Sequence, residues 1–362
     1  PTLHFGLGRK EVVDSLHIVW PNGEEQTISN IKADQEITVQ QERASKGKKE
    51  SKLTLPIFNE KEPPISFNHQ VGNDINDFKR QPLMPNSKSF VGPAMAKADI
   101  NNDGLVDIFI GGGAGQAGKI YVQKPSGEFE ITEQYGIEED KPSNDVDALF
   151  FDANGDGHED LYIASGGYGN FGPIDPALQD RLYLNDGNGN FAKSKRALPE
   201  MPTSTGTIAK GDVNGDGIPD LFVGGYVIPG RYPEIPRSYI LINDGQGSFN
   251  DQTLKVNPNL KSIGMVSDAI WHDMNGKGTK ELVLAGQWMP MSIFSIENGK
   301  LVNKNGKYFD KPYKGLWNKI LVDDFNQDGR PDIIAGNFGL NSQLKASKNK
   351  PAKLIYSDFD EN

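Results

Sequence analysis

Hydrophobic and polar residues alternate along most of the chain in short runs, each broken by glycine, proline, asparagine or aspartate. Short runs of apolar, β-branched and aromatic residues are typical of β-strands. No segment keeps a convincing long helical period, so we expect few helices. Strands are predicted at residues 107–110, 147–151, 161–163, 181–184, 221–223, 238–242, 282–284, 319–322 and 333–334, and Phe191 and Phe249 each open another.

One nine-residue pattern, D-x-N-x-D-G-x-x-D, recurs between these strands. Its copies start at Asp99, Asp152, Asp212, Asp273, Asp324 and Asp358. The starts are spaced roughly 50–60 residues apart, except for a shorter last interval. Each unit holds three or four strands, and residues 185–189 and 243–247 (N-D-G-x-G) are strong hairpin turns. This arrangement predicts an all-β fold and a β-propeller, because the repeats of a parallel β-helix are far shorter.

The N-terminal part of the chain lacks the Asp-rich pattern. Residues 12–20 and 36–40 read as strands around the turn Pro21-Asn22-Gly23. A charged stretch follows and is interpreted as a linker. The predicted domains are a small β-rich segment at 1–42, the linker at 43–52 and the propeller repeats at 53–362.

Composition narrows the classes of partner. The formal net charge is −11, which disfavours a general nucleic-acid binder, and much of the acid lies in the short loops, which favours cations. There are no cysteines, so disulfides and Cys-based zinc sites are excluded. No apolar run is long enough for a transmembrane helix. The abrupt start at Pro1 and the end inside a repeat indicate a piece of a longer protein, whose signal sequence is not part of this chain.

The loops suit calcium, which takes six to eight oxygen ligands in a tolerant geometry. Positions 1, 3 and 5 offer side-chain oxygens, position 7 a backbone carbonyl and position 9 an aspartate, while glycine at position 6 permits the turn. Flanking strands in place of helices exclude an EF-hand. The predicted ligands are Asp99, Asn101, Asp103, Leu105 and Asp107; Asp152, Asn154, Asp156, His158 and Asp160; Asp212, Asn214, Asp216, Ile218 and Asp220; and Asp324, Asn326, Asp328, Arg330 and Asp332.

The copy that starts at Asp273 departs from the pattern. Lys277 stands at position 5, where the other complete copies carry an aspartate. Its ammonium would repel calcium and could neutralise Asp273 and Glu281. We therefore expect about four calcium sites and none at this loop, and the sequence does not decide whether the copy at Asp358 binds metal.

Other candidate chemistry is weaker. Residues 113–119 contain G-x-G-x-x-G and part of a phosphate-binding loop, but Ile120 replaces the magnesium-binding Ser or Thr and a strand follows, so a glycine-rich connection is expected. The histidines show no zinc spacing, and no nucleophile elbow or singled-out acid pair is found. Aromatic residues near the blade ends either form a binding face or pack between blades. They are Tyr168, Phe171, Tyr226, Tyr232, Trp288 and Trp317.

The Asp-rich loops and N-D-G hairpins resemble the FG-GAP/VCBS repeats of integrin α-chain propellers and bacterial surface proteins. Residues 3–8 (LHFGLG), 13–14 (VD) and 19–23 (VWPNG) resemble the ASPIC/UnbV domain of bacterial relatives of cartilage acidic protein. The resemblance implies a seven-bladed propeller, calcium in the loops and an extracellular or bacterial cell-surface setting. A non-enzymatic binding or scaffolding module for a protein or glycan is expected, and a polysaccharide-degrading hydrolase or lyase is the alternative.

Overall fold

The computed structural model describes residues 3–46, 58, 62–72, 75–169, 171–340, 342 and 345–357. The chain divides into two compact units, Pro1–Glu62 and Pro63–Asn362. The predicted loop that starts at Asp358 lies outside the described residues. The finer division of the sequence, with a linker at 43–52, stays a prediction.

The first unit is a small antiparallel sheet. Its hairpin consists of β1 (Val12–Val19) and β2 (Glu24–Lys32), and β3 (Ser45–Lys46) pairs with β2 after a 3-10 helix, η1 (Gln41–Arg43). The expected turn joins β1 to β2, and the Gly23 amide donates to the Trp20 carbonyl at 2.8 Å.

The prediction of a strand at residues 36–40 is wrong, because this stretch is irregular. A tight turn returns the chain at once, so the partner of β1 begins at Glu24, directly after Gly23. The pairing runs from Val19 opposite Glu25 to Val12 opposite Lys32. The mostly polar composition of β2 hid this strand in the sequence.

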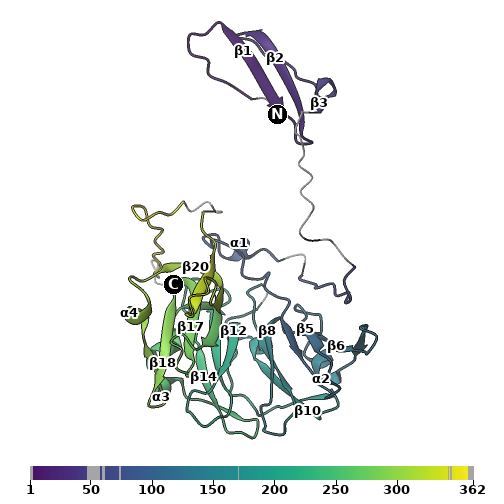
Figure 1. The fold of residues 1–362 in the computed structure, drawn as a ribbon, viewed down its shortest axis with the longest axis vertical. Helices are drawn as coiled ribbons and strands as arrows, with labels where there is room; N and C mark the ends of the chain where they lie inside the picture. Colours follow the sequence, from purple (N-terminus) through teal and green to yellow (C-terminus); the bar gives the residue numbers. More distant parts are fainter. Residues whose placement is uncertain are drawn as a thin grey trace. The chain divides into compact units, whose positions relative to one another are not determined.

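The second unit is built from antiparallel sheets that form the blades of a β-propeller (Figure 1). Blade 1 contains β4 (Met95–Ala98), β5 (Asp107–Ile110), β6 (Lys119–Gln123) and β7 (Phe129–Thr132). Blade 2 contains β8 (Asp145–Phe151), β9 (Asp160–Ser165), β10 (Arg181–Asn185) and β11 (Phe191–Lys193). Blade 3 contains β12 (Ser204–Gly211), β13 (Asp220–Val227), β14 (Tyr239–Asn243) and β15 (Phe249–Asp251).

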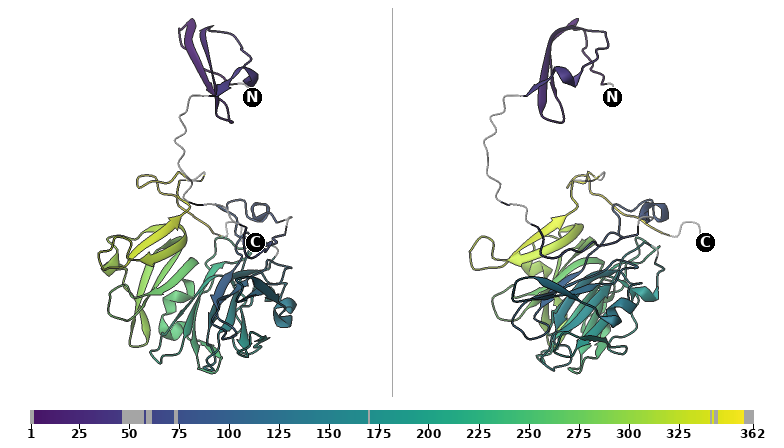
Figure 2. Two further views of the ribbon diagram at one scale, coloured as in Figure 1. Left: turned by 45° about the vertical axis from the view of Figure 1, so that its right-hand side comes forward. Right: turned by 90° about the vertical axis from the view of Figure 1, so that its right-hand side faces the viewer.

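Blade 4 contains β16 (Met265–His272), β17 (Glu281–Pro290), β18 (Ser292–Glu297) and β19 (Lys300–Asn303). Within the described residues blade 5 has two strands, β20 (Lys314–Asp323) and β21 (Asp332–Asn337), and β20 also pairs with β17. Figure 2 shows the blades following one another in chain order. The predicted β-propeller is confirmed, as an array of blades that is open among the described residues.

The helices are short, as the lack of a helical period predicts. They are α1 (Asp77–Arg80), α2 (Tyr135–Glu139), α3 (Thr253–Val256), α4 (Asn305–Tyr308) and the 3-10 turns η2 (Pro176–Leu178) and η3 (Pro258–Ser262). In the described part of the chain, no helix has the length and hydropathy that crossing a membrane requires.

The hydrophobic core lies between consecutive blades. One cluster joins Phe151, Tyr162 and Leu182 of blade 2 to Leu221 and Val223 of blade 3, and other clusters join blades 1 and 2, 3 and 4, and 4 and 5 in the same way. The middle strands β9 and β13 are buried along their whole length. They carry near-continuous apolar runs because both of their faces are covered by neighbouring blades.

Residues 75–91 pack against the blade ends opposite the Asp-rich loops. The Arg80 guanidinium donates to the carbonyls of Gly169 at 3.0 Å and Phe171 at 2.9 Å. The Lys88 side chain is fully buried, and its Nζ donates to Asn86 Oδ1, Tyr226 Oη and Gln287 Oε1. This segment therefore ties blades 2, 3 and 4 together.

Lys88 gives a pH-dependent prediction. Burial lowers its pKa to about 7, against an opposing effect of Asp77, whereas an unfolded lysine titrates near ~10.4. Between these values the unfolded state binds more protons, so the stability contributed by Lys88 rises with pH, by up to about 1.4 kcal/mol per unit. From pH 7 to 9, chemical denaturation should show wild type gaining about 2 kcal/mol relative to Lys88→Met; an unchanged difference contradicts this.

Several aromatic candidates for a binding face are instead packed inside the unit. Tyr168, Tyr226 and Tyr232 are buried in one cluster, and the Trp288 indole N–H donates to the Tyr232 hydroxyl at 2.7 Å. Residues 113–119 form the expected glycine-rich connection between β5 and β6. A Cβ added at Gly113 would lie 2.0 Å from the carbonyl oxygen of Gln70, so the close approach of two backbone segments requires glycine there.

Candidate metal centres

The Asp-rich loops occupy the same place in every blade, since each joins the first strand to the second. We number them loop 1 (residues 99–107), loop 2 (152–160), loop 3 (212–220), loop 4 (273–281) and loop 5 (324–332). The antiparallel pairing of the flanking strands brings the two ends of each loop together, as Gly211 and Asp220 pair across loop 3. The predicted ligands of one copy are thereby gathered at one blade edge.

Loop 3 shows how backbone amides fix the first three ligand side chains. The Asp216 amide donates to Asp212 Oδ1 at 3.1 Å and to Asn214 Oδ1 at 2.9 Å. The Gly217 amide donates to Asp212 Oδ2, and the Ile218 amide donates to Asp216 Oδ1. Gly217 has a φ of +84°, a value that strongly favours glycine. Positions 1, 3 and 5 therefore surround one tight turn.

Loops 1, 2 and 5 repeat this arrangement. Their position-5 amides lie 2.8–3.2 Å from the side-chain oxygens at positions 1 and 3. Their position-7 amides donate to the position-5 carboxylates at 2.8–2.9 Å. The side chains held in this way are Asp99, Asn101 and Asp103; Asp152, Asn154 and Asp156; and Asp324, Asn326 and Asp328, with Leu105, His158 and Arg330 at position 7.

The ninth residue lies differently in loops 1 to 3. Asp107, Asp160 and Asp220 are fully buried, and both carboxylate oxygens accept backbone amides. Asp160, for example, accepts from Ala153 at 3.0 Å and from Asn185 of the third strand at 2.8 Å. Burial raises the pKa of Asp160 to about 6, although these hydrogen bonds oppose the shift. The ninth aspartate thus joins the loop to the third strand of its own blade.

Loop 5 lacks this last connection. Asp332 is only partly buried, and it opens β21 opposite Asp323. In blades 1 to 3 the amide that reaches the ninth aspartate comes from the third strand. The described part of blade 5 ends after its second strand, so no such amide is supplied there.

Loop 4 keeps the turn but changes its polar partners. Asp273 accepts the Gly278 amide at 2.7 Å, and backbone hydrogen bonds lower its pKa. Glu281 accepts the Met274 amide and the Asn275 side-chain amide. Among the described residues no ion pair joins Lys277 to either acid. The absence of metal at this loop stays a prediction that rests on charge.

The donor set fits calcium in part. Positions 1, 3, 5 and 7 offer only oxygen atoms, which calcium prefers. As placed, no three histidine or acidic side chains among the described residues converge on a point that could hold a metal. The ninth aspartate accounts for this, because it bonds to a strand. Each carboxylate oxygen can accept a second partner, so its role as a ligand stays a prediction.

The hairpins contribute asparagines whose role the sequence did not reveal. Asn185 Nδ2 of blade 2 donates to the Ile100 carbonyl in loop 1 at 2.8 Å. Asn243 Nδ2 of blade 3 donates to the Ala153 carbonyl in loop 2 at 2.9 Å. Each Asp-rich loop is thus tied to the following blade through its second residue. The recurrence of Asn at the start of N-D-G-x-G was the available signal, but it was interpreted only as a turn.

Comparisons with known families agree with the repeats. The family described as "ASPIC and UnbV" matches residues 1–46, and the "FG-GAP-like repeat" matches residues 99–163 and 152–223. The chain is an FG-GAP repeat protein with an ASPIC/UnbV segment at its N-terminus. These FG-GAP repeats correspond to blades 1 to 3, where the loops are complete.

This FG-GAP repeat protein is also similar to integrin alpha-V of Gallus gallus, with 29% identity over 188 residues. The match covers 48% of the chain but only 17% of that integrin. The resemblance therefore concerns the propeller repeats, and most of the integrin has no counterpart here.

Solved structures similar to the FG-GAP repeat protein include other propellers. They are the Dos1 propeller (13% identity, TM-score 0.36, covering 65% of this chain and 52% of that one), Sqt1 of Saccharomyces cerevisiae (12%, 0.36, 66% and 56%) and a thermostable family-43 glycoside hydrolase (10%, 0.37, 70% and 87%). At these TM-scores and identities, the likenesses support no statement about ligand or activity.

Proposed function

We propose that this chain is a calcium-stabilised FG-GAP propeller that serves as an extracellular or cell-surface binding and scaffolding module for a protein or glycan. The observation that carries the proposal is the repeated turn of loops 1, 2, 3 and 5. In each, two carboxylates and one carboxamide surround the same glycine turn. Similarity to an integrin supports a binding role, and the acid-rich loops favour a setting rich in calcium.

Calcium would supply charge neutralisation. Two carboxylates ~4 Å apart repel by roughly 4 kcal/mol at an effective dielectric constant of 20, and a divalent cation reverses the sign of that interaction. The oxygens at positions 1, 3 and 5, with the carbonyl at position 7, would hold the ion. An ordered loop then presents its second carbonyl to the next blade, as Ile100 and Ala153 do. Metal binding and blade-to-blade contact are therefore coupled.

Two matched substitutions test the assignment of sites. Asp212→Ala removes position 1 of loop 3, and Asp273→Ala removes position 1 of loop 4. Calorimetric titration with calcium should show one fewer site for Asp212→Ala and an unchanged number for Asp273→Ala, because Lys277 disfavours calcium in loop 4. Equal losses in both variants, or no loss in either, would count against the proposed calcium loops.

A further inference from the structure

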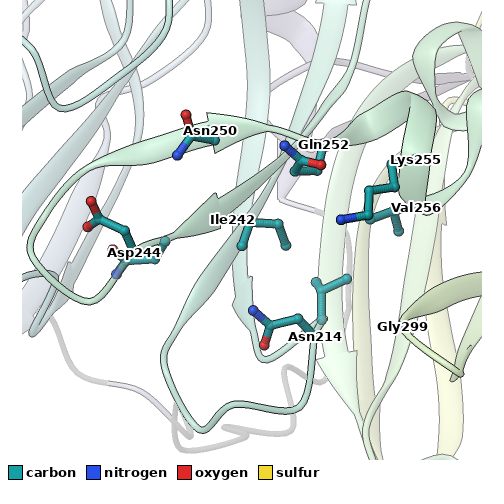
Figure 3. Close-up of a pocket in the computed structure, with 10 residues that line it drawn as sticks. Asn214, Ile242, Asp244, Asn250, Gln252, Lys255, Val256 and Gly299 are labelled. Carbon is teal, nitrogen blue, oxygen red and sulfur yellow. The ribbon is translucent and has the colours of Figure 1, made fainter.

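A cavity of about 320 Å³ lies between blades 3 and 4, beside loop 3 (Figure 3). Its wall includes Val213 and Asn214 of the loop, Ile242 on β14, Lys255 in α3 and Gly299 in the outer turn of blade 4. In Figure 3 the Lys255 ammonium and the Asn214 and Gln252 side chains surround Ile242. The cavity therefore lies where the two preceding blade interfaces are closed by a hairpin.

Strand register shows why this interface is open. Tyr183, Leu241 and Phe294 hold the same place in blades 2, 3 and 4, because they pair with Leu161, Leu221 and Leu282. Two residues further along, blades 2 and 3 carry the bridging Asn185 and Asn243, whereas blade 4 carries Ile296. An isoleucine side chain cannot donate a hydrogen bond to the preceding loop.

The outer turn of blade 4 is also shorter. Glu297 pairs with Lys300 across Asn298 and Gly299, which have φ values of +51° and +70°. This two-residue turn replaces the N-D-G-x-G hairpin of the two preceding blades. In the described residues no side chain donates to the Val213 carbonyl, although the equivalent carbonyls of Ile100 and Ala153 each accept an asparagine.

The cavity also presents unused polar groups. The Lys255 ammonium and the side-chain amides of Asn250 and Gln252 have no hydrogen-bond or ion-pair partner among the described residues. Asp244 on the rim already accepts the amides of Gln246 and Ser248. A ligand that fits must therefore offer a donor to the Val213 carbonyl and an acceptor or anion to Lys255.

We propose that this cavity is a docking site for a protein loop that presents a carboxamide beside a carboxylate, as an Asn-Asp turn does. The carboxamide donates to the Val213 carbonyl, in the way Asn185 and Asn243 contact loops 1 and 2 within the chain. The adjacent carboxylate pairs with Lys255. The inference rests on the proposed binding function and names its site, but it does not require calcium at loop 3.

The probe is the blocked peptide LNDGNGNF, the sequence of residues 184–191. Added to isotope-labelled protein in calcium, it should shift amide resonances of residues 213–214, 242–244, 250–256 and 299, with a dissociation constant of about 10⁻⁴–10⁻³ M, because a short flexible peptide is ordered on binding. Lys255→Met should weaken binding about fivefold, as expected for one exposed ion pair. Lys261→Met, an exposed lysine outside the cavity, should leave binding unchanged.

Two further variants address the carboxamide and the open notch. The peptide with its first Asn replaced by Ala should bind at least about fivefold more weakly. Replacing the Glu297–Lys300 turn, with Ile296→Asn, by the N-D-G-N-G hairpin should fill the cavity and abolish binding. Absence of shifts, equal binding by Lys255→Met, or shifts at these residues with a neutral saccharide and not with the peptide would overturn the proposal. Because calcium stoichiometry is measured separately, a protein that binds calcium but not the peptide rejects only this docking site.

Discussion

Removing calcium with a chelator should lower the melting temperature of the propeller unit by about 5–15 °C. Extracellular-type sites have dissociation constants of about 10⁻⁴–10⁻³ M. At about 2 mM calcium, each occupied site then stabilises the folded state by roughly 0.6–1.8 kcal/mol, so four sites contribute roughly 2.5–7 kcal/mol. A domain of this size loses about 2 °C per kcal/mol. Calorimetric melts with calcium and with excess chelator measure the shift.

The control for this melt is magnesium at the same concentration. Magnesium requires near-ideal octahedral geometry and dehydrates reluctantly, so it should restore little of the lost stability. Melting curves that coincide with and without chelator would contradict metal binding in the loops of blades 1, 2, 3 and 5.

Asp77→Asn should destabilise the propeller unit by about 3 kcal/mol, because it removes a buried charge from four donors. The Asp77 carboxylate accepts the Ser87 and Ser89 hydroxyls, each at 2.5 Å, and the Lys88 and Ser89 amides at 2.7 and 2.9 Å. The amide group of Asn would turn a donor toward some of these donors. Chemical denaturation at neutral pH measures the loss.

A second readout separates the charge of Asp77 from its shape. Burial raises its pKa, but the hydrogen bonds from Ser87, Ser89 and the amides outweigh burial and hold the pKa below its usual value. Its stabilising contribution is therefore present above pH ~4 and is lost as the pH falls further. The gap between wild type and Asp77→Asn should narrow on acidification. Glu133→Gln, at an exposed carboxylate, should change stability little, and an equal effect of both variants would contradict the burial argument.

The sequence predicted the blades well because their signals are local. Asp-Gly loops, apolar runs and N-D-G turns all act within a few residues, and the strands at 161–163, 221–223 and 282–284 lie inside β9, β13 and β17. The turn before β2 was also correct, but its partner strand was missed because β2 is mostly polar.

Contacts between distant parts of the chain could not be predicted. Nothing in the sequence around Lys88 indicates that its ammonium is buried between Tyr226 and Gln287, residues far along the chain. The ninth loop residue was expected to face the metal. In blades 1 to 3 it also accepts a third-strand amide, which depends on how the strands are registered. The bridging Asn185 and Asn243 depend on the placement of a neighbouring blade in the same way.

The placement of each apolar cluster between two consecutive blades sets how local opening is distributed. Every inner blade is held from both sides, whereas blade 5 has a single neighbour among the described residues. Stability in such an array is a sum over nearest-neighbour interfaces, and local opening starts at its less supported end. Hydrogen–deuterium exchange should therefore be slowest in β9 and β13 and progressively faster toward β21, so the propeller is a graded structure in which blades 2 and 3 are the last to open.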